Sequence, residues 1–396
     1  MGYISRPQRL WWRRTLFQIH LWVGVILGLY MVVIGLTGSL LVFKDELATL
    51  TYPSLMRTDA HDPASAVDLP QFVANAHKAF PEHKLVSAFV PGVYGGSFFA
   101  YMEGAGGSGL YVFGDSRGDI LGSLDVEKIW INWVADLHFR LLAGQTGFIV
   151  NGAGAAFLVL LCLTGMVLWW PGIRTWPRAL AVNFRKSWKR VNFDLHSAVG
   201  FWTLSLVSMW AISGVYFVWP RTVEHVVNWI SPVEAGVEPE FSIVRDPQAP
   251  LADLRGILAR SQYASPETRL AGFYLPSGGK TAMVVYQTRR GIRNFSETDH
   301  VYFHPTTGAL LGVWHAGVNP TLGSKLVYWL GPLHSGFYWG MGIKFLWAVL
   351  GLSLPVLTVT GALMYWNRSL AKLWSRLRSR GDMQSSASHA QARPAE

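Results

Sequence analysis

Four long apolar runs limit what this chain can fold into more than any other feature of its sequence. They extend over Leu16 to Phe43, Phe148 to Trp170, Leu195 to Trp219 and Phe345 to Trp366. Each run supplies the about 20 residues that a helix needs to cross a membrane. Charged residues make up only 15% of the 396 residues, whereas soluble proteins average about 25%. The sequence therefore predicts an α-helical membrane protein with four spans.

Basic residues gather beside these runs. Sixteen of the 34 Lys and Arg residues lie in residues 1–19, 171–192 and 367–396. Because cytoplasmic flanks of spanning helices are rich in Lys and Arg, both termini and the middle loop are expected in the cytoplasm. The two long loops are then expected on the outer side, in the periplasm of a bacterium. This placement also explains the net charge of +10 without a nucleic-acid partner.

Two further features restrict the class of protein. The first apolar run exceeds the about 7–15 residues of a cleaved signal's apolar region and no A-x-A site follows it, so it is expected to remain as a span. Cys162 is the single cysteine, which excludes disulfides within the chain and C-x-x-C-H haem attachment.

Histidines recur at two fixed distances from a small polar residue followed by glycine. The distance is seventeen residues in two cases and twenty-six in the other two. The members are His20 with Thr37-Gly38, His196 with Ser213-Gly214, His138 with Thr164-Gly165, and His334 with Thr360-Gly361. Self-similarity of this kind indicates an internal duplication, whose unit is a span, an exported domain and a second span.

Each exported loop reads as a small α+β domain. In the first, helical apolar spacing over residues 69–80 precedes strand-like segments at 84–90, 97–101, 111–113 and 120–122. The second repeats the order, with a helix over 251–263 and strands at 269–275, 281–287, 301–303 and 310–312. Alternating apolar residues around glycine-bearing turns favour hairpins. The expected fold is a four-span helical bundle with two periplasmic α+β domains.

The expected boundaries follow from these segments. They are 16–43 for the first span, 44–137 for the first exported domain, 138–170 for an interfacial segment and second span, 171–194 for a basic cytoplasmic loop, 195–219 for the third span, 220–333 for the second exported domain, 334–366 for an interfacial segment and fourth span, and 367–396 for a disordered cytoplasmic tail. The basic loop carries aromatic residues and is expected to contact anionic lipid.

The topology places two histidines at each face of the membrane. His20 and His196 begin outward-going spans on the cytoplasmic side, whereas His138 and His334 precede inward-going spans on the periplasmic side. One histidine near a helix end is as often a solvated or capping residue as a functional one. An ionisable residue within a span is costly and therefore a functional candidate, and two imidazoles suit the iron of a six-coordinate haem. The pairing therefore favours two non-covalent haem b groups, with His20 and His196 on one iron and His138 and His334 on the other.

The spacing of twenty-six residues also predicts a bend. A straight helix of that length spans about 39 Å, more than the about 30 Å of a bilayer's hydrocarbon core. A break is therefore expected after His138 and after His334. The glycines available for it are Gly144, Gly147, Gly152, Gly336, Gly340 and Gly342.

These motifs resemble the PepSY-associated transmembrane family of bacterial inner-membrane proteins, and within it the di-haem ferrisiderophore reductases. The resemblance rests on His-x-Trp-x-Gly in the first span, Asp136-Leu137-His138, Asp194-Leu195-His196 and Gly331-Pro332-Leu333-His334-Ser335-Gly336. It implies PepSY-like exported domains, haem b on the four histidines and reduction of a ferric siderophore in the periplasm. The electron donor, a quinol or a cytoplasmic flavoprotein, does not follow from it.

Two functions from other classes stay open at this point. Pseudo-repeats and intramembrane polar groups also mark transporters of a siderophore or small solute, although the spans lack carboxylates for a shared midplane site. A non-catalytic regulator with periplasmic binding domains is the other. His300, His304 and His315 on the last hairpin of the second loop are a further candidate for a metal or substrate site, against a solvated strand face.

Overall fold

The computed structural model describes residues 11–56, 68–93, 95–234, 241, 243, 251–275, 282–288, 298–315, 321–336 and 339–370. The chain divides into two compact units. The helical unit consists of Met1–Ser39, Gln145–Val218 and Phe345–Glu396, and the mixed unit consists of Leu40–Gly144 and Trp219–Lys344. The tail expected at 367–396 lies outside the described residues from position 371 onward.

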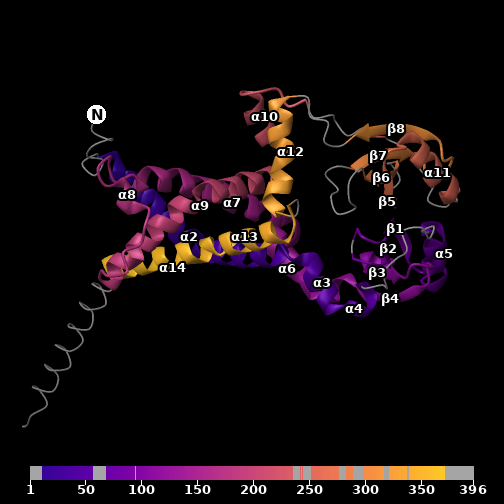
Figure 1. Ribbon diagram of the computed structural model, residues 1–396, viewed down its shortest axis with the longest axis horizontal. Coiled ribbons are helices and arrows are strands. Elements are labelled where there is room, and N and C mark those ends of the chain that lie inside the picture. Colours follow the sequence, from indigo (N-terminus) through magenta and orange to yellow (C-terminus); the bar gives the residue numbers. More distant parts are fainter. Residues whose placement is uncertain are drawn as a thin grey trace, which may run out of the picture. The chain divides into compact units, whose positions relative to one another are not determined.

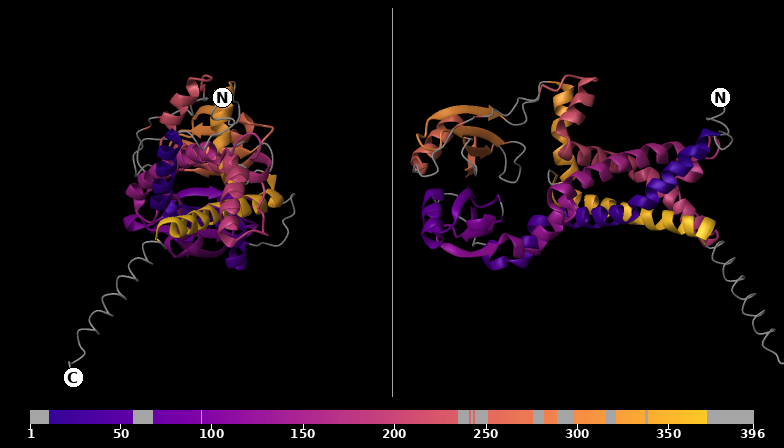
Figure 2. Two further views of the ribbon diagram at one scale, coloured as in Figure 1. Left: turned by 90° about the vertical axis from the view of Figure 1, so that its left-hand side faces the viewer. Right: turned by 180° about the vertical axis from the view of Figure 1, so that it is seen from behind.

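Four helices among the described residues are long and apolar enough to cross a membrane. They are α2 (Trp12–Leu41), α7 (Gly144–Trp169), α9 (Trp188–Val218) and a fourth over Met341–Arg368 that comprises α13 (Met341–Gly351), α14 (Ser353–Tyr365) and the start of η6 (Trp366–Leu370). Figures 1 and 2 show these helices running side by side in the helical unit. The expected set of four apolar helices is therefore present.

One expected boundary differs in the connection between α7 and α9. Residues 171–194 were expected as a loop, but α9 begins at Trp188 and carries the polar stretch before His196 in helical form. Arg190 and Asp194 are one helical turn apart and form an ion pair at 2.9 Å, which supports the helix there. Ahead of α9, the connection contains the short helix α8 (Trp176–Ala179).

The spanning helices meet at small residues. A side-chain carbon at Gly152 would lie 2.8 Å from Val218, and one at Gly35 would lie 2.7 Å from Pro355. Gly154 gives similar room to Tyr30, whose hydroxyl donates a hydrogen bond to the side-chain oxygen of Asn151 at 2.9 Å. Close approach at small residues is how helices pack where lipid removes the hydrophobic drive for their association.

The expected bends are present on both sides. The helix that carries His138, α6 (Trp130–Arg140), ends at Leu141 and Leu142, which both have positive φ angles, and α7 begins at Gly144. The helix that carries His334, α12 (Leu322–Ser335), ends at Gly336 with φ 68°. Gly144, one of the glycines expected at the first break, has a positive φ of 55°. Leu141 and Leu142 share the left-handed conformation with it, which a non-glycine residue adopts only at a cost.

The mixed unit contains an eight-stranded antiparallel sheet. The strands are β1 (Lys84–Phe89), β2 (Phe98–Glu103), β3 (Gly109–Gly114), β4 (Ile120–Asp125), β5 (Arg269–Tyr274), β6 (Met283–Thr288), β7 (Thr298–Phe303) and β8 (Leu310–His315). Besides α6 and α12, the helices of the mixed unit are α3 (Lys44–Thr51), α4 (Pro53–Met56), α5 (Leu69–Ala79), η2 (Ala105–Gly107), η3 (Val126–Lys128), α10 (Pro220–Asn228) and α11 (Leu254–Ala264). The strand order is β4-β3-β2-β1-β5-β6-β7-β8. Each strand corresponds to a segment that the sequence predicts.

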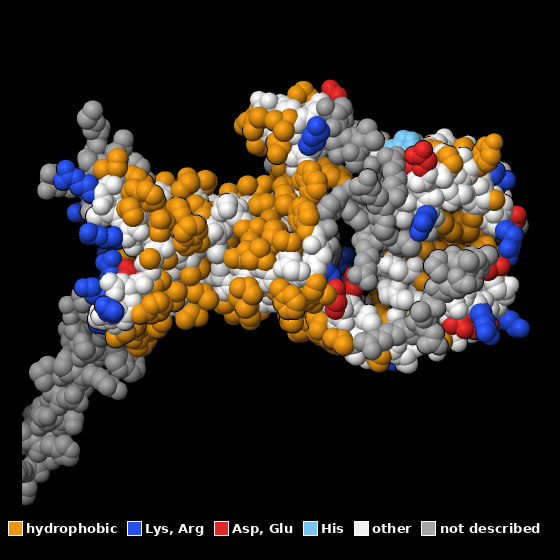
Figure 3. All heavy atoms as spheres, in the orientation of Figure 1, with side chains coloured by type: hydrophobic (Ala, Val, Ile, Leu, Met, Phe, Trp, Pro, Cys, Tyr) orange, Lys and Arg blue, Asp and Glu red, His pale blue; other side chains and the backbone are white. Residues whose placement is uncertain are grey.

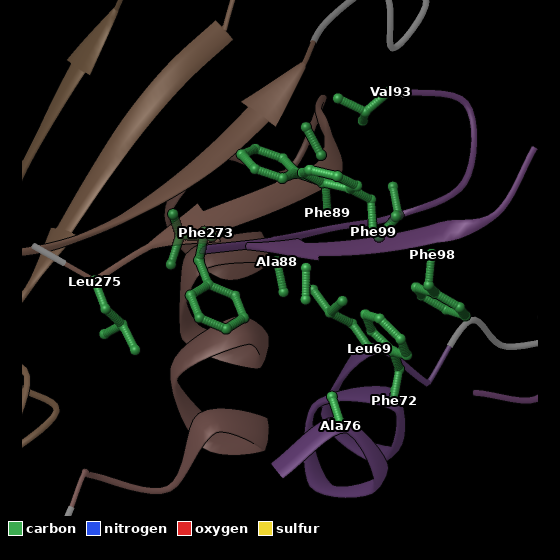
Figure 4. Packing of buried hydrophobic residues seen from close by; sticks show 14 of the residues in the cluster. Leu69, Phe72, Ala76, Ala88, Phe89, Val93, Phe98, Phe99, Phe273 and Leu275 are labelled. Carbon is green, nitrogen blue, oxygen red and sulfur yellow. The ribbon is translucent and has the colours of Figure 1, made fainter. Parts of the chain in front are cut away.

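The sequence suggested two separate α+β domains. In the structure the two segments share this one sheet, so they are not separate domains. Strand β1 pairs with β5 and places Ala88 opposite Phe273. The side chains of both segments form one core, and Figure 4 shows Ala88 of the first segment beside Phe273 of the second. The pairing covers the edge that each four-stranded half would otherwise expose. The two segments repeat one order of elements, and their origin by duplication stays a prediction.

Candidate functional site

The four histidines predicted as iron ligands fall into two groups. His20 in α2 and His196 in α9 belong to the helical unit, and His138 in α6 and His334 in α12 belong to the mixed unit. The imidazoles of His20 and His196 are close enough to interact electrostatically. The ring centres of His138 and His334 are 6.4 Å apart. The structure thus places the rings of His138 and His334 in contact and those of His20 and His196 within range of an electrostatic interaction. We call His20 and His196 the helical-unit pair, and His138 and His334 the mixed-unit pair.

A threonine on the neighbouring helix orients His20. The Nδ1 atom of His20 lies 2.9 Å from the hydroxyl oxygen of Thr164. That hydroxyl is also 2.8 Å from the carbonyl oxygen of Leu160, to which it donates. Since a hydroxyl has one hydrogen to donate, Thr164 accepts the bond from His20. Nδ1 therefore carries the hydrogen and Nε2 keeps the lone pair that a metal ion needs, as in metal sites whose histidines donate their other N–H.

His196 has the same arrangement on a different pair of helices. Its Nδ1 lies 2.9 Å from the hydroxyl oxygen of Thr360, which donates to the carbonyl oxygen of Val356 at 2.7 Å. The side chain of Asn192, one turn before His196, donates to the carbonyl oxygen of Thr360 at 2.9 Å. Both imidazoles of the helical-unit pair are therefore held with Nε2 available.

The glycine after each threonine leaves room for the ring. A side-chain carbon at Gly165 would lie 3.2 Å from Cε1 of His20, and one at Gly361 would lie 3.4 Å from Cε1 of His196. The sequence spacing had linked these Thr-Gly pairs with His138 and His334. The structure places them against the helical-unit pair instead, because spacing along the chain measures distance on one helix and not contact with its neighbour.

The mixed-unit pair lies in the last turns of two short helices. His138 is buried, with 9% of its surface exposed. Burial, and next the neighbouring imidazole of His138, lower the pKa of His334 from 6.5 to about 3. His334 is therefore neutral at physiological pH, which is the form that binds metal ions.

The separation of these two rings suits one metal ion between them. An imidazole nitrogen lies about 2.0–2.1 Å from a bound metal, with its ring centre about 1.1 Å farther, so two opposed imidazoles place their ring centres about 6.3 Å apart. The observed distance of 6.4 Å is close to this value, with the two ring planes at 66° to each other. No group of three His, Cys, Asp or Glu side chains suited to a metal ion occurs within the described ranges. Two imidazoles are the set that a haem, with four nitrogens of its own, requires.

A comparison with known protein families identifies the family of this chain. The model of the PepSY-associated TM region matches residues 17–368. The chain belongs to this family. A search of curated proteins found no match. The match covers all four histidines of this PepSY-associated protein, which is therefore a membrane protein with four apolar helices and an α+β unit.

His300, His304 and His315, on the last hairpin of the second segment, do not form a common site in this PepSY-associated protein. Nδ1 of His304 accepts hydrogen bonds from the backbone of its own turn. The ring of His300 packs against Trp314, with centres 4.8 Å apart. His315 contacts the buried carboxylate of Asp299 at 3.0 Å. Each histidine therefore has a structural role of its own, and the candidate metal or substrate site is not supported.

Sequence reasoning missed the partners of the helical-unit pair. The Thr-Gly pairs were noted as small residues, but Thr164 and Thr360 also accept the histidine hydrogen bonds. Asn192 precedes His196 by four residues and thus shares its helix face, which was the available signal. An ion pair in the mixed unit was missed as well, between Lys344 and Glu46 at 2.7 Å, and no sequence pattern indicated it.

Proposed function

We propose that this protein is a di-haem b oxidoreductase of the bacterial inner membrane that passes electrons outward to reduce ferric siderophores. The observation that carries the proposal is the presence of two histidine pairs, one of which has ring centres 6.4 Å apart.

The chain's own residues would hold and orient the two groups. His20 and His196 would bind one iron through Nε2, while Thr164 and Thr360 hold the opposite ring nitrogens. His138 and His334 would bind the other iron. Haem would supply one-electron exchange at iron, and the protein's contribution is position, hydrogen bonding and a low-dielectric surrounding.

The charge distribution supports a cytoplasmic location for one end of the helical unit. Lys and Arg side chains gather at one end of this unit in Figure 3, whereas apolar side chains cover its flank. Every Lys and Arg in the described part of the helical unit belongs to this end: Arg13, Arg14, Arg174, Arg178, Arg185, Lys186, Lys189, Arg190 and Arg368. The bias toward positive flanks on the inner side supports a periplasmic location for the sheet-bearing mixed unit.

The substrate follows from the resemblance to ferrisiderophore reductases and from iron chemistry. A siderophore binds ferric iron through hard oxygen ligands, and one electron converts the metal to ferrous iron, which such ligands hold less tightly. The mixed-unit pair is the candidate exit for that electron, since it belongs to the unit proposed to lie outside. A quinol or a cytoplasmic flavoprotein would supply electrons to the helical-unit pair.

Oriented vesicles test this function directly. Right-side-out vesicles with pre-reduced haem would receive a membrane-impermeant ferric siderophore outside, and haem reoxidation would be followed by absorbance. We expect reoxidation in the wild type, with most of it lost in His138→Ala and His334→Ala. In His20→Ala, a single electron should still reach the acceptor, although turnover from an inside donor should stop. Equal reoxidation in the wild type and all histidine variants would contradict the proposed route.

A further inference from the structure

An open cavity of about 250 Å³ lies at the basic end of the helical unit. It lies between α9 and the last turns of the α14–η6 helix and combines two cations, two amides and two apolar side chains. Its lining residues are Lys189, Asn192, Phe193, Met364, Asn367 and Arg368. The proposed function so far assigns no role to it.

The cavity continues the helix face that carries His196. Lys189, Asn192 and Phe193 precede His196 by seven, four and three residues, and such spacings place side chains on one face of a helix. Helical side chains also lean toward the N-terminus of their helix. The imidazole of His196 therefore leans toward the turn that supplies Asn192 and Phe193.

The opposite wall continues the face that carries Thr360 and Gly361. Met364 follows Gly361 by three residues, which places both on one face of α14, and Arg368 lies about one turn farther on, in the π-helix η6. These side chains lean back toward Gly361. The wall from α14 and η6 thus leans toward Gly361, where an added side-chain carbon would lie 3.4 Å from Cε1 of His196, and the wall from α9 begins one turn before that ring.

Arg368 also reaches the helix that carries the second histidine. Its guanidinium carbon lies 4.6 Å from the ring centre of Phe17, a cation–π contact. Phe17 precedes His20 by three residues and shares its face of α2. One cation of the cavity is therefore held beside the helix of His20, and the other belongs to the helix of His196.

The lining indicates what the cavity binds. Two cations favour an anionic ligand, and an arginine can donate hydrogen bonds to both oxygens of a carboxylate or to two oxygens of a phosphate. The side chains of Phe193 and Met364 provide an apolar wall beside the charges. The ligand should therefore carry acidic groups on an apolar body, and the body should extend toward the histidines.

We propose that this cavity binds the propionate carboxylates of the tetrapyrrole whose iron is held by His20 and His196, with Lys189 and Arg368 as their counter-ions. This inference rests on the proposed function and adds the residues that fix the second end of the cofactor. Cations beside the carboxylates offset negative charge near the iron and thereby favour its reduced state.

A double variant that removes both cations tests the inference in the full-length purified protein. Lys189→Gln/Arg368→Gln should release one of the two haems to apomyoglobin faster, by about tenfold or more for each cation, because a hydrogen bond to a charged group is worth at least that factor. The midpoint potential of that haem should shift downward in a redox titration. Lys189→Arg/Arg368→Lys keeps both charges and should retain the wild-type potential.

The matched control removes two cations outside the cavity, as Arg178→Gln/Lys186→Gln, and should change neither readout. If the wild-type protein holds two haems, and Lys189→Gln/Arg368→Gln changes neither the rate of haem loss nor the midpoint potential, this inference is wrong while the proposed function stands. If that variant instead lost only its stabilisation by added phosphatidylglycerol, the cavity would be a lipid-headgroup site and the inference would be wrong. Wild-type protein without haem would overturn the proposed function as well.

Discussion

The helical-unit pair and the mixed-unit pair present imidazoles in different ways. His20 and His196 lie within long helices, and each is oriented by a threonine on a neighbouring helix. His138 and His334 lie where short helices end, beside left-handed residues such as Leu141. The first pair therefore depends on how the spans pack, and the second on where α6 and α12 stop. The two proposed haems should accordingly respond to different substitutions.

The largest expected effect comes from removing a ligand. His20→Ala and His138→Ala should each lower the haem content from two to one per chain, because six-coordinate binding needs both axial histidines. The pyridine haemochrome assay measures the content, and a redox titration identifies which haem remains. His77→Ala, which alters an exposed residue, is the control. Loss of the same haem in both variants would show that the pairs are assigned wrongly.

Filling the space beside the ring should have the next largest effect, and only on the helical-unit pair. Gly165→Val places carbon atoms where the first would already lie 3.2 Å from Cε1 of His20, so the ring must move from its position. We expect a marked loss of one haem, measured by haem content, while the other stays. Gly342→Val is the control, since nothing lies within 4 Å of that position. Full retention of both haems in Gly165→Val would mean that the ring position is not required.

Removing the hydroxyl that orients His20 should be milder. Thr164→Val keeps the shape but removes the acceptor for Nδ1, and such changes around metal ligands cost about 10–100-fold in affinity. The haem of the helical-unit pair should be lost faster and its midpoint potential should rise, because the imidazole becomes less basic.

Thr203→Val provides the matched control, since the Thr203 hydroxyl bonds to the carbonyl of Val199 in its own helix. It should leave both potentials unchanged. An equal shift in Thr164→Val and Thr203→Val would point to helix packing and not to the histidine hydrogen bond.

The smallest effect on haem is expected from the ion pair of the mixed unit. Glu46→Gln removes the charged partner of Lys344, whose side chain is 9% exposed while that of Glu46 is 27% exposed. Loss of a charge-assisted hydrogen bond with this partial exposure should cost about 1–2 kcal/mol, seen as a lower melting temperature. Glu127→Gln, at an exposed position, should cost nothing measurable. Haem content should not change, and a loss of haem would tie this ion pair to the mixed-unit pair.

Much of the fold could be predicted because its signals are local. The apolar runs gave the four long helices, and alternation around turns gave every strand of the sheet. The pairing of β1 with β5 was not predictable, since both strands look alike as edges and their contact depends on the folded unit. Leu141 and Leu142 show the same limit, because a break near Gly144 was expected from helix length, but no local signal indicated that two leucines would take positive φ angles beside it.

The candidate site was predictable to the level of its histidines. Their recurrence identified two pairs, and the structure brings each pair together. The bonds from His20 to Thr164 and from His196 to Thr360 cross between helices, so no spacing along the chain reports them. The cavity at Lys189 and Arg368 likewise needs two helix ends to converge. Sequence periodicity predicts which residues share a helix face. Which neighbouring helix that face contacts depends on packing.

The most direct test of the central claim is the haem content of the purified wild-type protein, measured with its oxidised and dithionite-reduced spectra. Two bis-histidine sites predict two extractable haem b groups per chain, with low-spin spectra in both oxidation states. A protein with one haem would show that one histidine pair is structural. A colourless protein would contradict the account of both pairs.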